Sequence, residues 1–342
     1  MPSRGTARLI GIFEELPEDD VIVAISVVSD PMYVTGSARD SLPCRACGKE
    51  LHGAEVDTYS ICGTCGSANY VSVLSAEADN ATYFDEVYSD ATRHAIEKRH
   101  RQFHRWENLY SAVHAKEREA FHAVLDHMSK SIIAARKSVE VGFGSGHELA
   151  NYLKAGANMY GIDVSCEAVS RFRASNPQFS DRVALGNKVS SRADVLYCNA
   201  LFEHLDDPAA FLDNAAACLS RDGLLLLRLP IITARVYSPE ELRWDINCWK
   251  PCHRVLYTYR GLETLLKTHG FSIVESAPLA YYGYKVMSTM LRHGFADVAR
   301  VRNPYFAITG LESDGRYLMI LVESVFRKLI CSDFAVVAKR MQ

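Results

Sequence analysis

Short apolar runs and segments with helical spacing alternate along the second half of the chain. Five apolar runs predict strands around Glu140 and at 158–163, 182–186, 194–199 and 224–229. Between them, apolar positions recur every three or four residues and predict helices at 147–154, 166–175 and 209–219. Alternating strands and helices are typical of a parallel sheet that is covered on both faces. The pattern therefore predicts an α/β domain.

Toward the C-terminus the pattern predicts a helix at 261–269, a strand at 270–274 and a last strand at 333–338. The intervening segment, 279–330, has the spacing of amphipathic helices inserted before the last strand. Nearer the N-terminus, residues 8–13 and 21–28 have the pattern of strands, and we find no candidate chemistry before residue 40.

Three alternating glycines, Gly142, Gly144 and Gly146, follow the strand around Glu140, and a predicted helix begins directly after them. Glycine has no Cβ, so the backbone can turn sharply and approach a ligand closely, while the helix start points free N–H groups at it. The next predicted strand ends in Asp163, where a nucleotide-binding α/β unit places its ribose-binding carboxylate. A purely structural glycine turn is the alternative, but Glu140 and Asp163 together favour a cofactor site.

Residues 91–137 repeat apolar and aromatic positions at helical spacing, and we interpret them as amphipathic helix that covers the cofactor cleft. His100 and His104 lie four residues apart in this region. Such a pair could hold a metal ion, an alternative that no suitably placed carboxylate supports.

Two Cys-x-x-Cys pairs, each followed by glycine, precede this region: Cys44 with Cys47, and Cys62 with Cys65. Four thiolates at this spacing can converge on one zinc ion, and they would close its tetrahedral shell without leaving a position for water. We therefore predict a zinc ribbon with a structural role. A pair of redox motifs or unrelated cysteines are the alternatives, and redox motifs do not normally occur as a spaced pair with matching glycines.

Composition narrows the possible partners. The 342 residues are 48% hydrophobic and 23% charged, with a net charge of −3 and no dense Lys/Arg block. This disfavours a nucleic-acid partner held mainly through phosphates. We recognise no signal peptide and no membrane-spanning run, and the six other cysteines are scattered as in reduced proteins. We therefore expect a cytoplasmic protein; the pattern says nothing about its oligomeric state.

The glycine turn reads Glu-x-Gly-x-Gly-x-Gly, not the dinucleotide pattern Gly-x-Gly-x-x-Gly. With Phe202-Glu203-His204-Leu205-x-Asp207-Pro208 it resembles class I, Rossmann-like S-adenosylmethionine (SAM)-dependent methyltransferases. The order of motifs over residues 44–340 is similar to a bacterial group that modifies small molecules, sugars and glycans. Many of its members carry an N-terminal four-cysteine zinc module. The resemblance implies seven strands in the order 3-2-1-4-5-7-6, with the last strand antiparallel.

The resemblance also implies a set of residues around SAM. Glu140 would lie near its ammonium group, Asp163 near the ribose hydroxyls and Val164 against the adenine. Asn187 stands where the family usually has an acidic residue near the adenine amino group. The implied SAM-binding residues are Glu140, Gly142, Phe143, Gly144, Gly146, Asp163, Val164, Asn187, Asn199, Ala200 and Leu201.

Methylation of an oxygen requires removal of a proton, and histidine is suited to that role at neutral pH. His204 and His253 are the candidate bases, with a purely structural role as the alternative for each. Sugar C-methyltransferases of this type have Tyr-x-Glu-His near the second position. This chain has Trp249, Cys252 and His253 there and lacks the glutamate, which disfavours C-methylation.

We therefore expect methyl transfer to a small-molecule, sugar or glycan acceptor, preferably at oxygen, with nitrogen as the next choice. An RNA or protein methyltransferase that docks its substrate through the zinc ribbon is one alternative, and a non-catalytic SAM-binding protein is another. The expected domains are 1–75 with the ribbon, 76–137 as helical lid, and 138–342 as methyltransferase domain with the helical insertion at 279–330.

Overall fold

The protein is described by a computed structural model that covers residues 42–51, 55–56, 59–70, 110–232, 247, 253–280, 282–293, 317–326 and 331–341. The expected strands at 8–13 and 21–28, the pair His100 and His104, and Cys252 lie outside these residues.

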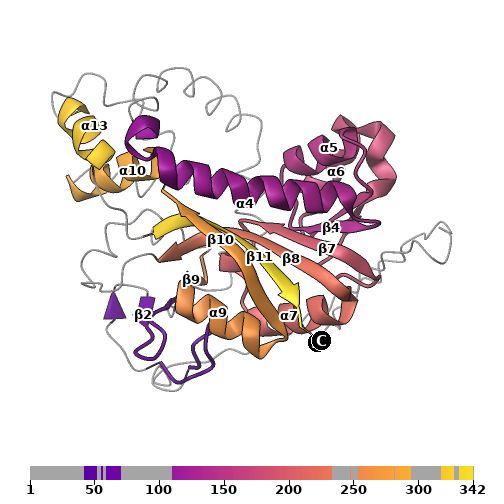
Figure 1. The fold of residues 1–342 in the computed structure, drawn as a ribbon, viewed down its shortest axis with the longest axis horizontal. Helices are drawn as coiled ribbons and strands as arrows, with labels where there is room; N and C mark the ends of the chain where they lie inside the picture. Colours follow the sequence, from indigo (N-terminus) through magenta and orange to yellow (C-terminus); the bar gives the residue numbers. More distant parts are fainter. Residues whose placement is uncertain are drawn as a thin grey trace, which may run out of the picture.

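A mixed sheet with helices on both faces forms the centre of the described chain (Figure 1). Five strands are parallel and neighbour one another in the order β6 (Val183–Leu185), β5 (Met159–Asp163), β4 (Ser138–Val141), β7 (Ala193–Asn199) and β8 (Leu219–Ile232). β11 (Cys331–Arg340) pairs antiparallel with β8, and β10 (Phe271–Leu279) pairs antiparallel with β11. The predicted α/β fold is thus confirmed at the level of a mixed sheet between helices.

The predicted count of seven strands is wrong, because the described residues alone contribute eleven strands to the sheet. The seven strands above lie in the expected order, but the sheet also branches at β8. One edge of β8 pairs with β7 as far as Arg228, and farther along it pairs with β9 (Val255–Thr258) through Ile231 and Ile232. The other edge pairs with β11. This is possible because β8 extends well beyond the expected 224–229.

The described residues around the four cysteines (42–51, 55–56 and 59–70), here called the cysteine segment, continue the sheet beyond β9. Its strands are β1 (Glu55–Val56), β2 (Tyr59–Ile61) and β3 (Ala68–Tyr70), which pair antiparallel, and β3 pairs with β9. The first 75 residues were expected to form a separate domain, and the division of the chain into domains remains a prediction. Strand pairing nevertheless joins the described part of that segment directly to the main sheet.

Helices begin where side chains can accept hydrogen bonds from their first turn. Ser165 caps α6 (Cys166–Ser175), Asp207 caps α7 (Pro208–Cys218) and Thr258 caps α9 (Tyr259–Thr268), each by accepting a hydrogen bond from a backbone N–H three residues ahead. α5 (His147–Lys154) begins after Gly146 without such a cap. Two short 3₁₀ helices complete this part, η2 (Pro177–Arg182) and η3 (Phe202–His204).

α4 (Ala115–Ala134) lies along the sheet and packs against β10 and β11 (Figure 1). It buries one face, formed by Phe121, Val124, Met128 and Ile132, at the three- and four-residue spacing of an amphipathic helix. The structure thus contains a helix within the expected 91–137. A role for the whole region in covering a cofactor cleft stays a prediction.

Two hydrophobic clusters cover the two faces of the sheet. Tyr197 of β7 packs with α4, α5 and α6, whereas Leu196 and Cys198 of the same strand pack with α7, α9 and the cysteines. Within the expected insertion, α10 (Tyr282–Arg292) packs against α13 (Tyr317–Phe326). In the described ranges no helix combines the length and apolarity that a membrane span requires.

Candidate functional site

The three glycines after β4 all adopt left-handed backbone conformations. Their φ angles are +72° at Gly142, +51° at Gly144 and +68° at Gly146. A Cβ on Gly146 would lie 2.3 Å from Cδ2 of Phe172, and one on Gly142 would lie 2.9 Å from Cδ1 of Leu201. Glycine is therefore required here for two reasons, backbone conformation and space. The turn brings the start of α5 to the end of β4, as the sequence predicts.

Asp163 at the end of β5 fixes this turn. Its Oδ2 accepts a hydrogen bond from the N–H of Gly144 at 2.8 Å, and its Oδ1 accepts one from the N–H of Ser165 at 2.8 Å. The carboxylate is 7% exposed. Each carboxylate oxygen can accept a further hydrogen bond, so the same group can bridge the turn and a ligand hydroxyl.

Glu140 lies below the turn on β4, buried at 3% exposure. Burial, together with the neighbouring charges of Glu148 and Asp163, raises the pKa of the Glu140 carboxyl well above its usual value. Its Oε2 makes no hydrogen bond within the described parts of the chain. A buried carboxyl with an open acceptor is suited to a cationic ligand group, because the cation would favour its ionised form.

The segment after β7 forms a second wall against the turn. Leu201 contacts the position of Gly142, and Ala200 adopts a left-handed conformation with φ +51°. Its N–H donates to the carbonyl of Arg228 at 2.7 Å. Left-handed residues other than glycine are uncommon and concentrate at functional sites. The structure therefore places Leu201 against the glycine turn, directly after Asn199 and Ala200 at the end of β7.

Three other expected SAM-binding residues differ in the exposure of their side chains. The Val164 side chain is 56% exposed beside Asp163, and Asn187 is also exposed. Phe143 instead turns inward, is 5% exposed and packs edge-on against Phe172 with ring centroids 5.6 Å apart. Only the backbone of Phe143 can therefore face a ligand at the turn.

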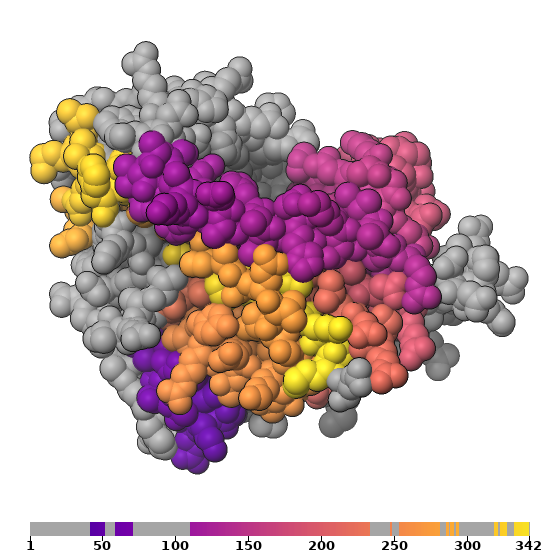
Figure 2. Space-filling model, viewed as in Figure 1, coloured from indigo at the N-terminus to yellow at the C-terminus, as the bar shows by residue number. Residues whose placement is uncertain are grey.

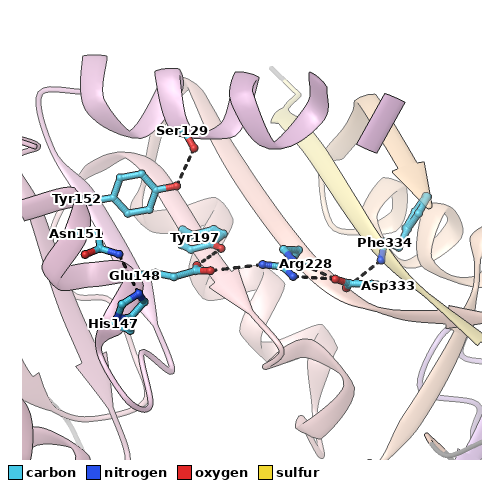
Figure 3. Close-up of polar contacts among 9 residues, drawn as sticks. All are labelled: Ser129, His147, Glu148, Asn151, Tyr152, Tyr197, Arg228, Asp333 and Phe334. Carbon is cyan, nitrogen blue, oxygen red and sulfur yellow. Dashed lines mark hydrogen bonds and ion pairs between the residues drawn. The ribbon is translucent and has the colours of Figure 1, made fainter. Parts of the chain in front are cut away.

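A polar network behind the turn was not expected from the sequence. Arg228 of β8 pairs with Asp333 of β11 at 2.9 Å and with Glu148 of α5 at 3.4 Å (Figure 3). The Tyr197 hydroxyl donates to the other oxygen of Glu148. The network ties the first turn of α5 to three strands. Because its members come from four separate elements, no local motif could have revealed it.

His204 and His253 lie together, although 48 residues separate them in the sequence. Their ring centroids are 4.8 Å apart with the rings edge to face. The Glu203 carboxylate lies 3.7 Å from Nε2 of His204. Side-chain ligand atoms of these three residues all lie within 4.8 Å of one another, and Glu203 and His253 are each 2% exposed. Such a group can hold and move a proton, because the carboxylate stabilises a protonated imidazole.

The four cysteines of the predicted ribbon converge. Their sulfur atoms all lie within 4.8 Å of one another, with 3.7 Å between Cys44 and Cys65 and 3.6 Å between Cys47 and Cys62. Disulfide sulfurs would be about 2 Å apart. Four sulfurs around one zinc ion, each about 2.3 Å from the metal, are about 3.8 Å apart, so the separations fit a zinc shell.

The two cysteine pairs share one backbone geometry. Gly48 donates to the carbonyl of Cys44, and Gly66 donates to that of Cys62, both at 2.8 Å. The two glycines have φ of +69° and +79°. A hydrogen bond from the Cys65 thiol, aided by backbone N–H groups, lowers the pKa of Cys44 to about 5. Gly48 and Gly66 thus make equivalent tight turns after the two cysteine pairs.

Comparison with known proteins finds similarity to methyltransferases. Residues 112–276 match the methyltransferase domain family. Phenazine-1-carboxylate N-methyltransferase of Pseudomonas aeruginosa is 26% identical in an alignment 148 residues long, which covers 40% of this chain and 44% of that protein. The match thus spans less than half the length of this curated relative. Together, the family match and the relative support a SAM-dependent methyltransferase domain.

The solved structures that resemble this chain have lower sequence identity to it. A sarcosine dimethylglycine methyltransferase candidate from Galdieria sulphuraria is 13% identical, with a TM-score of 0.45 over 64% of this chain and 83% of that one. An O-methyltransferase from a polyketide synthase multienzyme of Brevibacillus brevis is 10% identical, with a TM-score of 0.44 over 68% and 79%.

Proposed function

We propose, from the methyltransferase-domain match over residues 112–276, that the protein transfers a methyl group from SAM to a small-molecule, sugar or glycan acceptor, preferably at oxygen. The observation that carries this proposal is the environment of the glycine turn. The buried carboxyl of Glu140 lies on the strand before the turn, Asp163 accepts a hydrogen bond from Gly144 within it, and Leu201 packs against Gly142.

The residues present fit SAM. Asp163 would accept hydrogen bonds from the ribose hydroxyls, and the exposed side chain of Val164 would lie against the adenine, near Asn187. Glu140 would compensate the ammonium group, which would favour its ionised form. Gly142 and Gly144 would allow close approach of the backbone, and Asn199–Leu201 would form the opposite wall. The bound cofactor supplies an electrophilic methyl group on a sulfonium, so the protein's task is alignment and exclusion of water.

His253 and His204 are the proposed proton acceptors for an acceptor hydroxyl. The position of buried His253 and half-buried His204 beside Glu203 suits this role, because a carboxylate stabilises the imidazolium that forms when the proton is taken. The carboxylate also restricts the orientation of the rings. Glu203 is thus proposed to support the histidines.

The curated relative acts, by its name, on nitrogen of an aromatic carboxylate. This supports a small organic acceptor for the present chain and makes N-methylation the second candidate. Transfer to RNA or protein receives less support. The described strand β3 of the cysteine segment is paired into the main sheet, and Cys44, Cys62 and Cys65 lie in the same hydrophobic cluster as the sheet. A cytoplasmic location remains part of the proposal.

Zinc in the cysteine segment is proposed to be structural. The sulfur separations and the matching turns fit a shell of four thiolates. Asn69 supports this arrangement, since its Nδ2 donates to the Cys44 sulfur at 3.4 Å. A closed shell of this kind stabilises the fold and takes no part in methyl transfer.

The proposal is tested with methyl-labelled SAM and a panel of hydroxyl, amine and carboxylate acceptors. We expect label to move to at least one small acceptor. The variant His253→Ala should lose about 100-fold in turnover while its SAM affinity changes less than threefold. Tight SAM binding without any labelled product would favour a non-catalytic SAM-binding protein. An equal loss of turnover and SAM affinity would assign His253 a structural role.

A further inference from the structure

The cysteine segment makes direct hydrogen bonds to the backbone that carries His253. The Tyr59 hydroxyl of β2 donates to the carbonyl of His253 at 2.9 Å. The N–H of Tyr70 in β3 donates to the carbonyl of Arg254 at 2.9 Å. The N–H of Arg254 in turn donates to the carbonyl of Glu203 at 2.7 Å. Both histidine-bearing segments are therefore connected to the cysteine segment through one short path.

The first cysteine pair reaches the chain just beyond His204. The Arg45 side chain donates to the carbonyls of Asp206 and Tyr70, each at 3.2 Å. The N–H of Arg45 donates to Oδ1 of Asn69 at 2.9 Å, and the amide group of Asn69 donates to Cys44. Asn69 is fully buried. A shift of the Cys44 side of the site would therefore displace Arg45, which contacts the loop after His204.

The second cysteine pair holds the end of β9. The Thr258 hydroxyl donates to the carbonyl of Cys65 at 2.6 Å, and the N–H of Thr258 donates to Oγ of Ser67 at 3.1 Å. A Cβ on Gly261, in the first turn of α9, would lie 2.2 Å from that same Oγ. Figure 2 shows the cysteine segment against this part of the molecule. The segment from His253 to Thr258 is thus fastened at both ends by the cysteine segment.

The glycine turn is held in another way. Its hydrogen bonds run to β5, within the turn and to α5, and its side-chain neighbours are Phe172 and Leu201. None of the hydrogen bonds described for residues 142–146 comes from residues 42–70. The two halves of the proposed site therefore have separate supports.

We propose that the cysteine segment is a positioning element for the His204–His253 pair, acting on the proton-accepting half of the site and not on the cofactor-binding half. The inference rests on the proposed function for the role of the histidines. Tyr59 and Arg45 are positioning residues, since both act through backbone carbonyls. Burial of Glu203 and His253 leaves little room for the two rings to compensate a shift of their backbone.

The test uses the full-length protein with its bound metal and the variant Tyr59→Phe, which removes one hydroxyl and keeps the ring in its cluster. Tyr152→Phe is the matched control. It removes a tyrosine hydroxyl that bonds to Ser129 at 3.0 Å in the hydrophobic cluster on the α4 side of the sheet. Amide hydrogen exchange is followed in peptides covering 201–208, 253–260 and 140–147. Imidazole resonances of ¹⁵N-labelled His204 and His253 are titrated in the same variants.

We expect Tyr59→Phe to speed exchange at 253–260 and 201–208 at least fivefold and to shift the titration midpoint of His253. Exchange at 140–147, zinc content and affinity for S-adenosylhomocysteine should stay within twofold of the unsubstituted protein. Tyr152→Phe should leave both histidine segments and both midpoints unchanged.

Unchanged exchange and unchanged midpoints in Tyr59→Phe would overturn the inference, as would equal loosening of 140–147. A second equivalent of zinc that is lost on Glu203→Gln would also overturn it, because an ion would then hold the histidines. Failure of S-adenosylhomocysteine to bind the unsubstituted protein would instead contradict the proposed function, so the two failures are distinguishable.

Discussion

The glycine turn follows β4 and His204 follows the neighbouring strand β7, but the turn and the histidine pair are stabilised in different ways. The turn is built from residues within one short stretch, Gly142–Gly146, and depends on backbone conformations that glycine adopts without strain. The histidine pair is assembled from η3, the segment before β9, and the cysteine segment, which lies almost 200 residues upstream of His253. One half of the proposed site is thus local and the other is non-local.

This difference affects the conformational entropy that is lost when each half forms. A local turn orders few residues and closes no long loop. Joining distant segments closes a long loop, and contacts between the segments must offset the conformational entropy that is lost. A metal ion bound by the four cysteines would offset this loss of entropy, because its binding free energy contributes to folding. We therefore predict that loss of a cysteine ligand disturbs the histidine half. Addition of a single Cβ at a glycine should disturb the glycine half.

The largest expected effect comes from Cys62→Ser. Loss of one thiolate should abolish tight zinc binding and lower the free energy of unfolding by about 4 kcal/mol or more. Calorimetric melting and metal analysis would measure this. Cys166→Ser is the control, because that thiol is exposed and outside the cluster. A soluble Cys62→Ser protein with unchanged melting and one equivalent of zinc would contradict the structural role.

The glycine half is tested by comparing Gly146→Ala with Gly156→Ala. Both positions have positive φ, +68° and +88°, so both variants carry a backbone penalty of about 1 kcal/mol. Only at Gly146 would the new Cβ also meet the Phe172 ring, whereas nothing lies within 4 Å of it at Gly156. We expect Gly146→Ala to cost about 2 kcal/mol more in denaturant unfolding. Equal losses would show that the turn can shift to make room.

The local half was also the part that could be predicted from the sequence. The glycines and Glu140 lie in one short stretch and Asp163 ends the next strand, and the helices at 147–154 and 166–175 begin and end where expected. Local periodicity and caps determine such elements. The inward orientation of Phe143 was not predictable, because it depends on Phe172 in another helix.

The non-local half could be predicted only as a list of residues. The two histidines were recognised as candidates, but nothing in the sequence indicated that Tyr59 contacts His253 or that β3 extends the sheet through β9. The strand count was wrong for the same reason, since pairing across some 190 residues leaves no periodic signal. Arg228 was missed because its partners Glu148 and Asp333 lie far away along the chain.

Arg228→Met tests whether this network supports the glycine half. The Arg228 side chain is 20% exposed, so its removal leaves two partly buried carboxylates without their cation and should cost about 2 kcal/mol. Arg136→Met is the control, because Arg136 pairs with Asp194 on the surface with its side chain 88% exposed. Its effect on chemical unfolding should be clearly smaller. Equal effects would mean that the network adds no more than a surface pair.

A smaller effect, and of opposite sign, is expected for Glu140→Gln. Burial raises the pKa of Glu140, so the folded protein binds more protons than the unfolded chain above pH 4.5, and its stability falls as the pH rises through that window. Without cofactor, Glu140→Gln should therefore be about 1 kcal/mol more stable at pH 8. Melting measured between pH 5 and pH 8 would show a flatter dependence. Destabilisation at pH 8 would indicate that Glu140 is ionised and compensated in the free protein.

The assignment of the glycine turn as the cofactor site is tested most directly by calorimetric titration of S-adenosylhomocysteine. The titrated proteins are the unsubstituted protein, Asp163→Asn and the surface control Asp126→Asn, whose side chain is 62% exposed. Loss of charged hydrogen bonds to the ribose hydroxyls should weaken binding about 10- to 100-fold in Asp163→Asn, while the control binds normally. Equal affinities in all three proteins, or no binding to the unsubstituted protein, would contradict the assignment of this turn as the cofactor site.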